Sequence, residues 1–161
     1  MPLSVGDRIP STKIKVASEK GGGEETTTQA LFAGKKVVLF GLPGAFTPTC
    51  SAKHLPGFID HADALREKGA DLIACVSVND AFVMGAWGRD AKAFGKVVLL
   101  ADGNGELARA LGLEVDLAAA LMGVRCQRFL AIFDDGVCTS VNVEQPGKFE
   151  VSSAEVALTL L

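Results

Sequence analysis

The sequence lacks the features that mark several large classes of proteins. Its 16 lysines and arginines stand against 19 aspartates and glutamates and form no basic block, so the positive surface of a nucleic-acid-binding protein is not expected. No apolar run approaches the roughly 20 residues that span a bilayer. Residues 1–7 (MPLSVGD) have neither the basic start nor the apolar centre of a secretory signal. We therefore expect neither nucleic acid nor a membrane among the partners.

The sequence also lacks the common paired-cysteine motifs. The four cysteines, Cys50, Cys75, Cys126 and Cys138, include no C-x-x-C pair, which argues against a zinc ribbon and against the thioredoxin dithiol. A secreted disulfide framework is not expected at this length without a signal. The pattern favours a reducing intracellular compartment in which the thiols stay free, and it predicts no metal site.

The rest of the composition is that of a folded globular protein. Hydrophobic residues make up 48% of the 161 residues, enough for a sizeable core in one domain over residues 1–161. Apolar runs predict strands, and helical spacing with capping residues predicts helices between them. The predicted strands are a polar hairpin within residues 14–28 that turns at 21–23, and residues 36–41, 71–78, 97–101, 128–133 and 137–143.

The predicted helices alternate with these strands over much of the chain. They extend from the segment after residue 47 to about residue 68, from residue 79 or 80 through 87, over 106–111, and from a capping box at Ser152 and Glu155 to the C-terminus. This order predicts an α/β fold with a central mixed β-sheet flanked by helices and an N-terminal β-hairpin extension.

The most informative segment is residues 43–50 (PGAFTPTC), which links an apolar strand to a helical stretch. Thr47 suits the helix N-cap, and Pro48 suits the first helical position. Cys50 then lies in the first turn, where free backbone N–H groups and the positive end of the helix dipole favour a thiolate. The segment therefore predicts a nucleophilic cysteine. Further along the same helix, Pro56 predicts a break or kink near residues 54–55.

A thiolate alone does not explain an enzyme at this position. A larger thiolate population raises a rate far less than the about millionfold acceleration that enzymes commonly reach. A catalyst must also stabilise the charge that moves onto the leaving atom. Thr47 offers a hydroxyl for this purpose, and Pro43 and Pro48 fix the loop around it. A guanidinium is the natural third group, because it directs two donors toward neighbouring oxygens and stays charged.

The spacing Pro43-x-x-x-Thr47-x-x-Cys50 is similar to the active-site motif of the peroxiredoxins. Residues 38–51 resemble the type II, or peroxiredoxin-5, subfamily, and the plant members most nearly. Further blocks match in the same order, namely residues 54–58 (HLPGF), residues 76–80 (VSVND) and Arg125-x-x-Arg128-Phe129. The resemblance extends from residue 5 almost to the C-terminus, and it implies a thioredoxin-like fold.

The resemblance also implies an activity, that of a thiol peroxidase which reduces hydrogen peroxide and alkyl hydroperoxides without a metal or organic cofactor. Cys50 matches the peroxidatic cysteine. Thr47 and Arg128 match the groups that hold the thiolate and the peroxide, and Pro43 matches the residue that shields the pocket. Attack by Cys50 yields a sulfenic acid, which a thiol must reduce before it over-oxidises. Thioredoxin, or glutathione with glutaredoxin, is the implied reductant.

The resemblance also bears on how oxidised Cys50 is reduced, on the oligomeric state and on the cellular compartment. Some type II members, especially those of plants, have a second cysteine at the spacing of Cys75, where it is implicated as the resolving thiol. A Cys50–Cys75 bridge is one expectation, and direct reduction of Cys50 by glutathione or glutaredoxin is the other. Residues 148–152, near which animal members carry their resolving cysteine, contain none. A homodimer is expected, in the cytoplasm or in an organelle such as the plastid if a transit peptide has been removed.

Three other interpretations of Cys50 remain open at this point. His54 lies four residues later, so the pair would suit a cysteine hydrolase, although a packing or hydrogen-bonding role for His54 is favoured. A redox sensor that is oxidised without turnover is the second alternative. A disulfide reductase, weakened by the missing C-x-x-C, is the third. Arg125 is expected to be a surface charge.

Several further residues are expected to be structural. Cys126 and Cys138 are interpreted as incidental, although the arginines near Cys126 favour its thiolate and make it a candidate for secondary oxidation. Phe46, Phe82 and Phe129 are expected in the core, and any of them that is exposed would suit the dimer contact.

Overall fold

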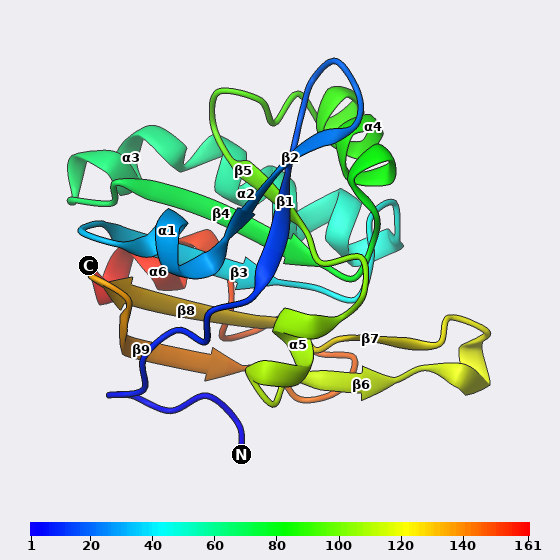
Figure 1. Ribbon diagram of the computed structural model, residues 1–161. Coiled ribbons are helices and arrows are strands. Elements are labelled where there is room, and N and C mark those ends of the chain that lie inside the picture. The colour runs from blue at the N-terminus through cyan, green and yellow to red at the C-terminus, as the bar shows by residue number, and fades with distance from the viewer.

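A seven-stranded β-sheet forms the centre of the computed structural model, which describes residues 1–161 (Figure 1). Its strands are β1 (Lys13–Ala17), β2 (Gly23–Thr27), β3 (Lys36–Gly41), β4 (Leu72–Ser77), β5 (Val98–Ala101), β8 (Phe129–Asp134) and β9 (Val137–Val143). Their order in the sheet is β2-β1-β5-β4-β3-β8-β9. The three inner strands β3, β4 and β5 are parallel, and the hairpins β1–β2 and β8–β9 extend the sheet antiparallel on either side. The predicted mixed sheet with an N-terminal hairpin is confirmed.

Helices cover both faces of this sheet. They are α1 (Thr28–Phe32), α2 (Leu55–Asp60), α3 (Ala62–Glu67), α4 (Ala81–Ala91), α5 (Glu106–Ala110) and α6 (Ala154–Leu160). Buried side chains of α2, α3, α4 and α6 pack on one face, and those of α1 and α5 pack on the other. None of these helices has the length and apolar character needed to cross a membrane.

Alternation along the inner strands creates a separate apolar core on each face. In β3, Val38 and Phe40 face the helices α2, α3, α4 and α6, and we call this cluster core A. Val37 and Leu39 face the opposite side, which we call core B. Each inner strand is therefore buried on both faces, which explains why the sequence shows continuous apolar runs there.

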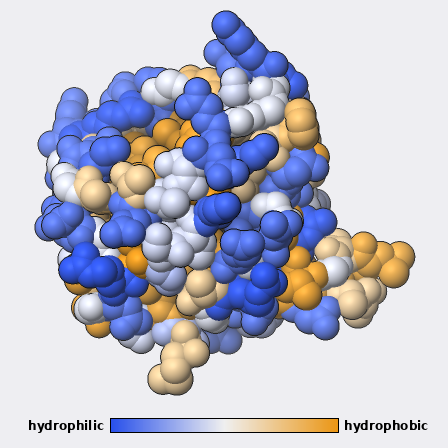
Figure 2. Space-filling view, in the orientation of Figure 1, coloured by the Kyte–Doolittle hydropathy of each residue, from blue (hydrophilic) through white to orange (hydrophobic).

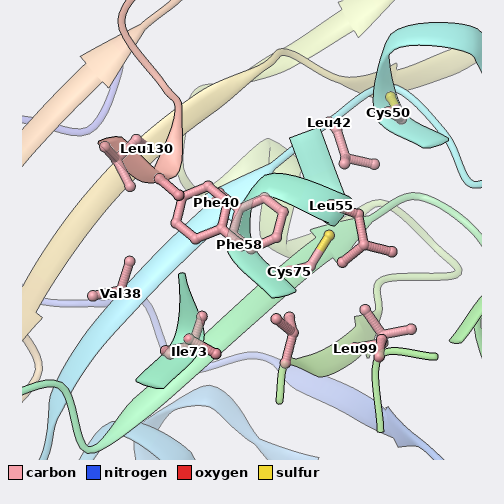
Figure 3. Close-up of a cluster of buried hydrophobic side chains, with 14 of the residues drawn as sticks. Val38, Phe40, Leu42, Cys50, Leu55, Phe58, Ile73, Cys75, Leu99 and Leu130 are labelled. Atoms are coloured by element: carbon pink, nitrogen blue, oxygen red, sulfur yellow. The ribbon is translucent and has the colours of Figure 1, made fainter. Parts of the chain in front are cut away.

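An aromatic pair in core A attaches α2 to the sheet. The rings of Phe40 and Phe58 stack with their centroids 3.9 Å apart and an angle of 7° between the ring planes (Figure 3). Both side chains are fully buried. Aromatic side chains of this size dominate the energetics of a core, so this contact fixes the position of the helical segment that follows residues 43–50.

That helical segment is divided into three parts. Residues Cys50–His54 form a π-helix, in which the N–H of Leu55 donates to the carbonyl of Cys50. The helix continues as α2 from Leu55, directly before Pro56, so the predicted irregularity upstream of this proline is present as a change from π-helix to α-helix. A second break, at His61 between α2 and α3, was not predicted from the sequence.

A two-stranded ribbon, which the sequence analysis missed, projects from the body of the molecule (Figure 1). It consists of β6 (Glu114–Asp116) and β7 (Val124–Cys126), connected through a 3₁₀-turn at Ala118–Ala120. Strands of three residues are too short to show a reliable alternation. The tip is apolar and forms the protrusion at the right of Figure 2, where Leu121 is 94% exposed.

Two expectations about local structure are wrong. The last helix is capped by Ser153, whose hydroxyl accepts from the N–H of Val156, and not by Ser152. Ser152 is fully buried and its hydroxyl donates to a carboxylate, so it is not free to cap. Phe129 lies in the core as expected, but Phe46 and Phe82 are 51% and 68% exposed.

We expect the Phe40–Phe58 stack to carry a large share of the stability. Replacing Phe58 with alanine leaves a cavity in core A and should lower the free energy of unfolding by about 3–5 kcal/mol. The exposed Phe82 is a matched control, because Phe82→Ala should change that free energy by less than about 0.5 kcal/mol. Urea unfolding of both variants measures the difference, and equal effects would contradict the assignment of Phe58 to the core.

Candidate active site

Cys50 lies at the C-terminal end of β3, where the chain turns from the sheet into the helical segment. The helix begins at Pro48, as predicted, and the carbonyl of Thr47 accepts from the N–H of Ser51 at 2.9 Å. The Thr47 hydroxyl does not cap the helix, however, because it donates to the carbonyl of Gly44 at 2.7 Å. The Cys50 side chain is fully buried in core A.

Two polar residues that the sequence analysis had not assigned to the site hold the loop before Cys50. The side-chain oxygen of Asn79 accepts from the N–H of Ala45 at 2.9 Å. Arg125 donates to the carbonyl of Pro43 at 3.3 Å, so it is not the surface charge that we expected. A Cβ at Gly44 would lie 2.8 Å from the Arg125 guanidinium, so the arginine packs closely over this glycine. The only sequence signals were the position of Asn79 after a buried strand and that of Arg125 beside the ribbon.

The side chain of Arg128 connects Cys50 to His54. Its Nη2 donates to the sulfur of Cys50 at 3.1 Å, and its Nη1 donates to Nδ1 of His54 at 2.8 Å. Arg128 takes part in none of the ion pairs of the structure. Its positive charge is therefore directed at the sulfur and is not neutralised by a carboxylate.

His54 is a neutral hydrogen-bonding residue and is not placed to act as a base. Its Nε2 donates to the carbonyl of Ser152 at 2.8 Å, which leaves Nδ1 as the acceptor for Arg128. Burial and the neighbouring Arg128 charge lower the pKa of His54 to about 3. Both ring nitrogens are occupied, so the geometry does not favour a hydrolase that uses His54 to deprotonate Cys50.

A cavity of about 210 Å³ lies beside these residues. Pro43, Thr49 and Arg128 form its inner wall, and the segment from Glu144 to Lys148 closes the other side. A larger cavity of about 310 Å³ lies elsewhere, between β1 and the start of α4. The smaller cavity is the one lined by Arg128, whose guanidinium contacts the Cys50 sulfur.

The other three cysteines are buried free thiols. Cys75, in β4, shares core A with Cys50, and Leu42 and Leu55 lie between the two in the view of Figure 3. Cys126 and Cys138 lie in core B, on the opposite face. Burial raises the pKa of all three thiols. The expectation that nearby arginines favour a thiolate at Cys126 is therefore wrong, because burial and the charge of Asp102 both raise the pKa of this thiol.

Comparisons with known proteins agree along the whole chain. The redoxin family matches residues 4–158. Peroxiredoxin-2B of Arabidopsis thaliana is 49% identical over 160 residues, which cover 99% of both chains. The chloroplastic peroxiredoxin-2E of the same plant is 49% identical over 162 residues, 99% of this chain and 69% of that protein. The crystal structure of reduced Prx3 from Vibrio vulnificus in complex with H₂O₂ superposes with a TM-score of 0.92 at 50% identity, covering 99% of each chain. This chain, with its thioredoxin-like fold, belongs to the redoxin family and, within it, to the type II peroxiredoxins.

Proposed function

We propose that the thiol-dependent peroxidase activity of this family is carried in this chain by Cys50, acting on hydrogen peroxide and alkyl hydroperoxides. The observation that supports this most directly is the contact between the Arg128 guanidinium and the Cys50 sulfur, at 3.1 Å. A fixed positive charge at that distance stabilises a thiolate and the oxygen atoms of a peroxide that approaches it.

In the proposed reaction, the Cys50 thiolate attacks one peroxide oxygen in line with the O–O bond. A sulfur–oxygen bond forms while the O–O bond breaks, so that sulfur loses two electrons and the peroxide gains them. The departing oxygen takes a proton and leaves as water or an alcohol, and Cys50 becomes a sulfenic acid. Arg128 and the free N–H groups of the helix start stabilise the charge on the departing oxygen, and Pro43 shields the cavity.

The role of Thr47 in this reaction depends on the orientation of its hydroxyl group. Its hydroxyl proton points to the Gly44 carbonyl, which leaves its lone pairs free to accept a hydrogen bond. Donation from Thr47 to a bound peroxide therefore requires rotation of the hydroxyl. No metal, haem or flavin is needed, because sulfur supplies both electrons.

We propose Cys75 as the resolving thiol, with direct reduction by glutathione or glutaredoxin as the alternative. Cys75 shares core A with Cys50, whereas the other two thiols lie in core B. Strand β4 is paired on both sides, so Cys75 cannot move. A bridge needs the two Cα atoms within about 7 Å, and we propose that the π-helix that starts at Cys50 unwinds to allow this approach. Thioredoxin or glutaredoxin would then reduce the bridge.

Assembly and location are part of the same proposal. Phe46, in the loop before Cys50, is 51% exposed, which suits an interface between two copies of the chain. The relatives include a chloroplastic protein, and we propose the cytoplasm or the plastid as the compartment.

Replacing Cys50 with serine should abolish peroxide consumption, because the nucleophile is removed. Cys138→Ser is the matched control and should retain full turnover, since Cys138 lies in core B and only donates to the Ser140 carbonyl, as serine also can. Peroxide consumption is measured with thioredoxin or glutaredoxin as reductant. Equal turnover in wild type and Cys50→Ser would end the assignment, and a single oxidation without turnover would favour a redox sensor.

Arg128→Gln should slow the oxidation of Cys50 by about 10²–10³-fold, because a charged donor is lost beside the developing charge. The exposed Arg109 provides the control, and Arg109→Gln should leave the rate unchanged. Stopped-flow measurement of the first oxidation step separates this effect from recycling. A rate within threefold of wild type for Arg128→Gln would contradict the mechanism.

Formation of the Cys50–Cys75 bridge should be visible in the fluorescence of Trp87. This is the only tryptophan, the chain has no tyrosine, and its indole N–H donates to the Ser51 hydroxyl at 2.9 Å, beside Cys50. Unwinding of the π-helix breaks that bond, so peroxide should shift the emission in wild type but not in Cys75→Ser. A peptide map in which oxidised Cys50 is bonded to glutathione alone would refute the bridge.

A further inference from the structure

Glu144 is a buried carboxylate that no part of the proposed reaction uses. It follows β9 directly and is 7% exposed. Its Oε2 accepts from the N–H groups of Glu150, Val151 and Ser152 at 2.8, 2.8 and 2.9 Å. It also accepts from the Ser152 hydroxyl at 2.6 Å. The Glu144 carboxylate therefore fixes the three-residue segment 150–152 in one conformation.

This segment carries the acceptor that orients His54. The carbonyl of Ser152 receives the Nε2–H of His54, which leaves the lone pair of Nδ1 directed at Arg128. The backbone N–H of Glu144 in turn donates to the carbonyl of Arg128 at 2.9 Å. A closed ring of hydrogen bonds thus connects Glu144, Ser152, His54 and Arg128. Outside this ring, Arg128 also donates to the sulfur of Cys50.

The ring orients the arginine without neutralising it. A carboxylate in direct contact with Arg128 would compete with the sulfur for the guanidinium. Here Ser152 and His54 lie between the Glu144 carboxylate and the guanidinium in this chain of hydrogen bonds, and the side chain that contacts the guanidinium is a neutral imidazole. Phe149, from the same loop, covers both partners, with its ring centroid 5.0 Å from that of His54 and 5.8 Å from the Arg128 guanidinium carbon.

We propose that Glu144 is a positioning residue for the peroxidase reaction, acting through Ser152 and His54 to hold the Arg128 guanidinium against Cys50. The inference rests on the proposed function of Cys50 and Arg128. It assigns a task to the loop between β9 and α6, which in this chain fixes the arginine and carries no cysteine.

The ring also keeps His54 from taking up a proton. The charged groups that face His54 are Arg128, from the start of β8, and Glu144, from the end of β9, and Cys50 lies on its own helical segment. Its remaining neighbours are the rings of Phe40, Phe58 and Phe149. If segment 150–152 is released, water reaches the imidazole and its pKa rises toward the ordinary value of about 6.5. A protonated His54 presents an N–H to Arg128 and repels it.

The first experiment compares Glu144→Gln with Glu67→Gln, which removes the same charge from an exposed position on α3. In Glu144→Gln, the side-chain NH₂ group would face the backbone N–H groups of residues 150–152, which are also donors. This substitution should therefore release segment 150–152. We expect the rate of Cys50 oxidation, divided by that of wild type at the same pH, to fall about tenfold to a hundredfold between pH 7.5 and 5.5. The same ratio for Glu67→Gln should stay near one. A Glu144→Gln ratio that does not vary with pH would overturn the proposal.

A second measurement observes the ring directly and does not depend on activity. The chain has two histidines, so ¹⁵N spectra of wild type and of His61→Gln assign His54. In wild type, His54 should carry its proton on Nε2 and remain neutral down to about pH 4. In Glu144→Gln, or in Ser152→Ala if the former does not fold, its pKa should rise. An unchanged titration in the folded variant, or a wild-type His54 that titrates near its ordinary pKa, would refute the ring.

The double variant Glu144→Gln/His54→Asn separates positioning from a general loss of structure. Asparagine places an uncharged acceptor near the site of Nδ1. The rate of Cys50 oxidation relative to wild type should therefore no longer fall between pH 7.5 and 5.5. If the relative rate still falls with pH in the double variant, the role of His54 is refuted. Failure of wild type to reduce peroxide would refute the proposed function, and the ¹⁵N titration would still decide whether the ring exists.

Discussion

The hydrogen bond from Arg128 to the sulfur of Cys50 is the interaction on which the arrangement of the site depends. It joins residues 78 positions apart, and the sheet register makes it possible. Gly41, the last residue of β3, pairs with Phe129, the first residue of the antiparallel β8. Arg128 therefore emerges beside the loop that carries Cys50. Both strands are paired on both sides within the sheet, which gives this pair a rigid base.

The two-sided sheet also divides the chemistry of the four thiols. Cys75 of β4 lies in the same core as Cys50, whereas Cys126 and Cys138 lie in the core on the other face. Burial raises the pKa of the three cysteines other than Cys50 and so suppresses their nucleophilic form. Only Cys50 combines a place at a helical start with a guanidinium contact. Reactivity in this chain is thus selected by position in the fold, not by cysteine content.

Much of the scaffold could be predicted from the sequence because its signals are local. Continuous apolar runs marked β3 and β4, and the predicted strands 128–133 and 137–143 correspond to β8 and β9. The same local logic failed at Ser152, where a capping pattern with Glu155 was present but the hydroxyl is used by Glu144. The hydrogen-bond partners of Arg128 could not be predicted from the sequence for a similar reason. His54 lies 74 positions from Arg128 and 98 positions from Ser152, and no spacing rule connects them before the fold brings them together.

The occupied imidazole of His54 has a consequence for the durability of the nucleophile. A sulfur and an imidazole four residues apart on a helix are the beginning of a chelate for zinc or copper ions. Here one ring nitrogen holds its proton against the Ser152 carbonyl, and the lone pair of the other is taken by Arg128. An approaching cation finds no free imidazole lone pair and meets the positive guanidinium beside the sulfur. The contacts that aim the arginine therefore also deny a metal ion the imidazole ligand that it would need beside the Cys50 sulfur.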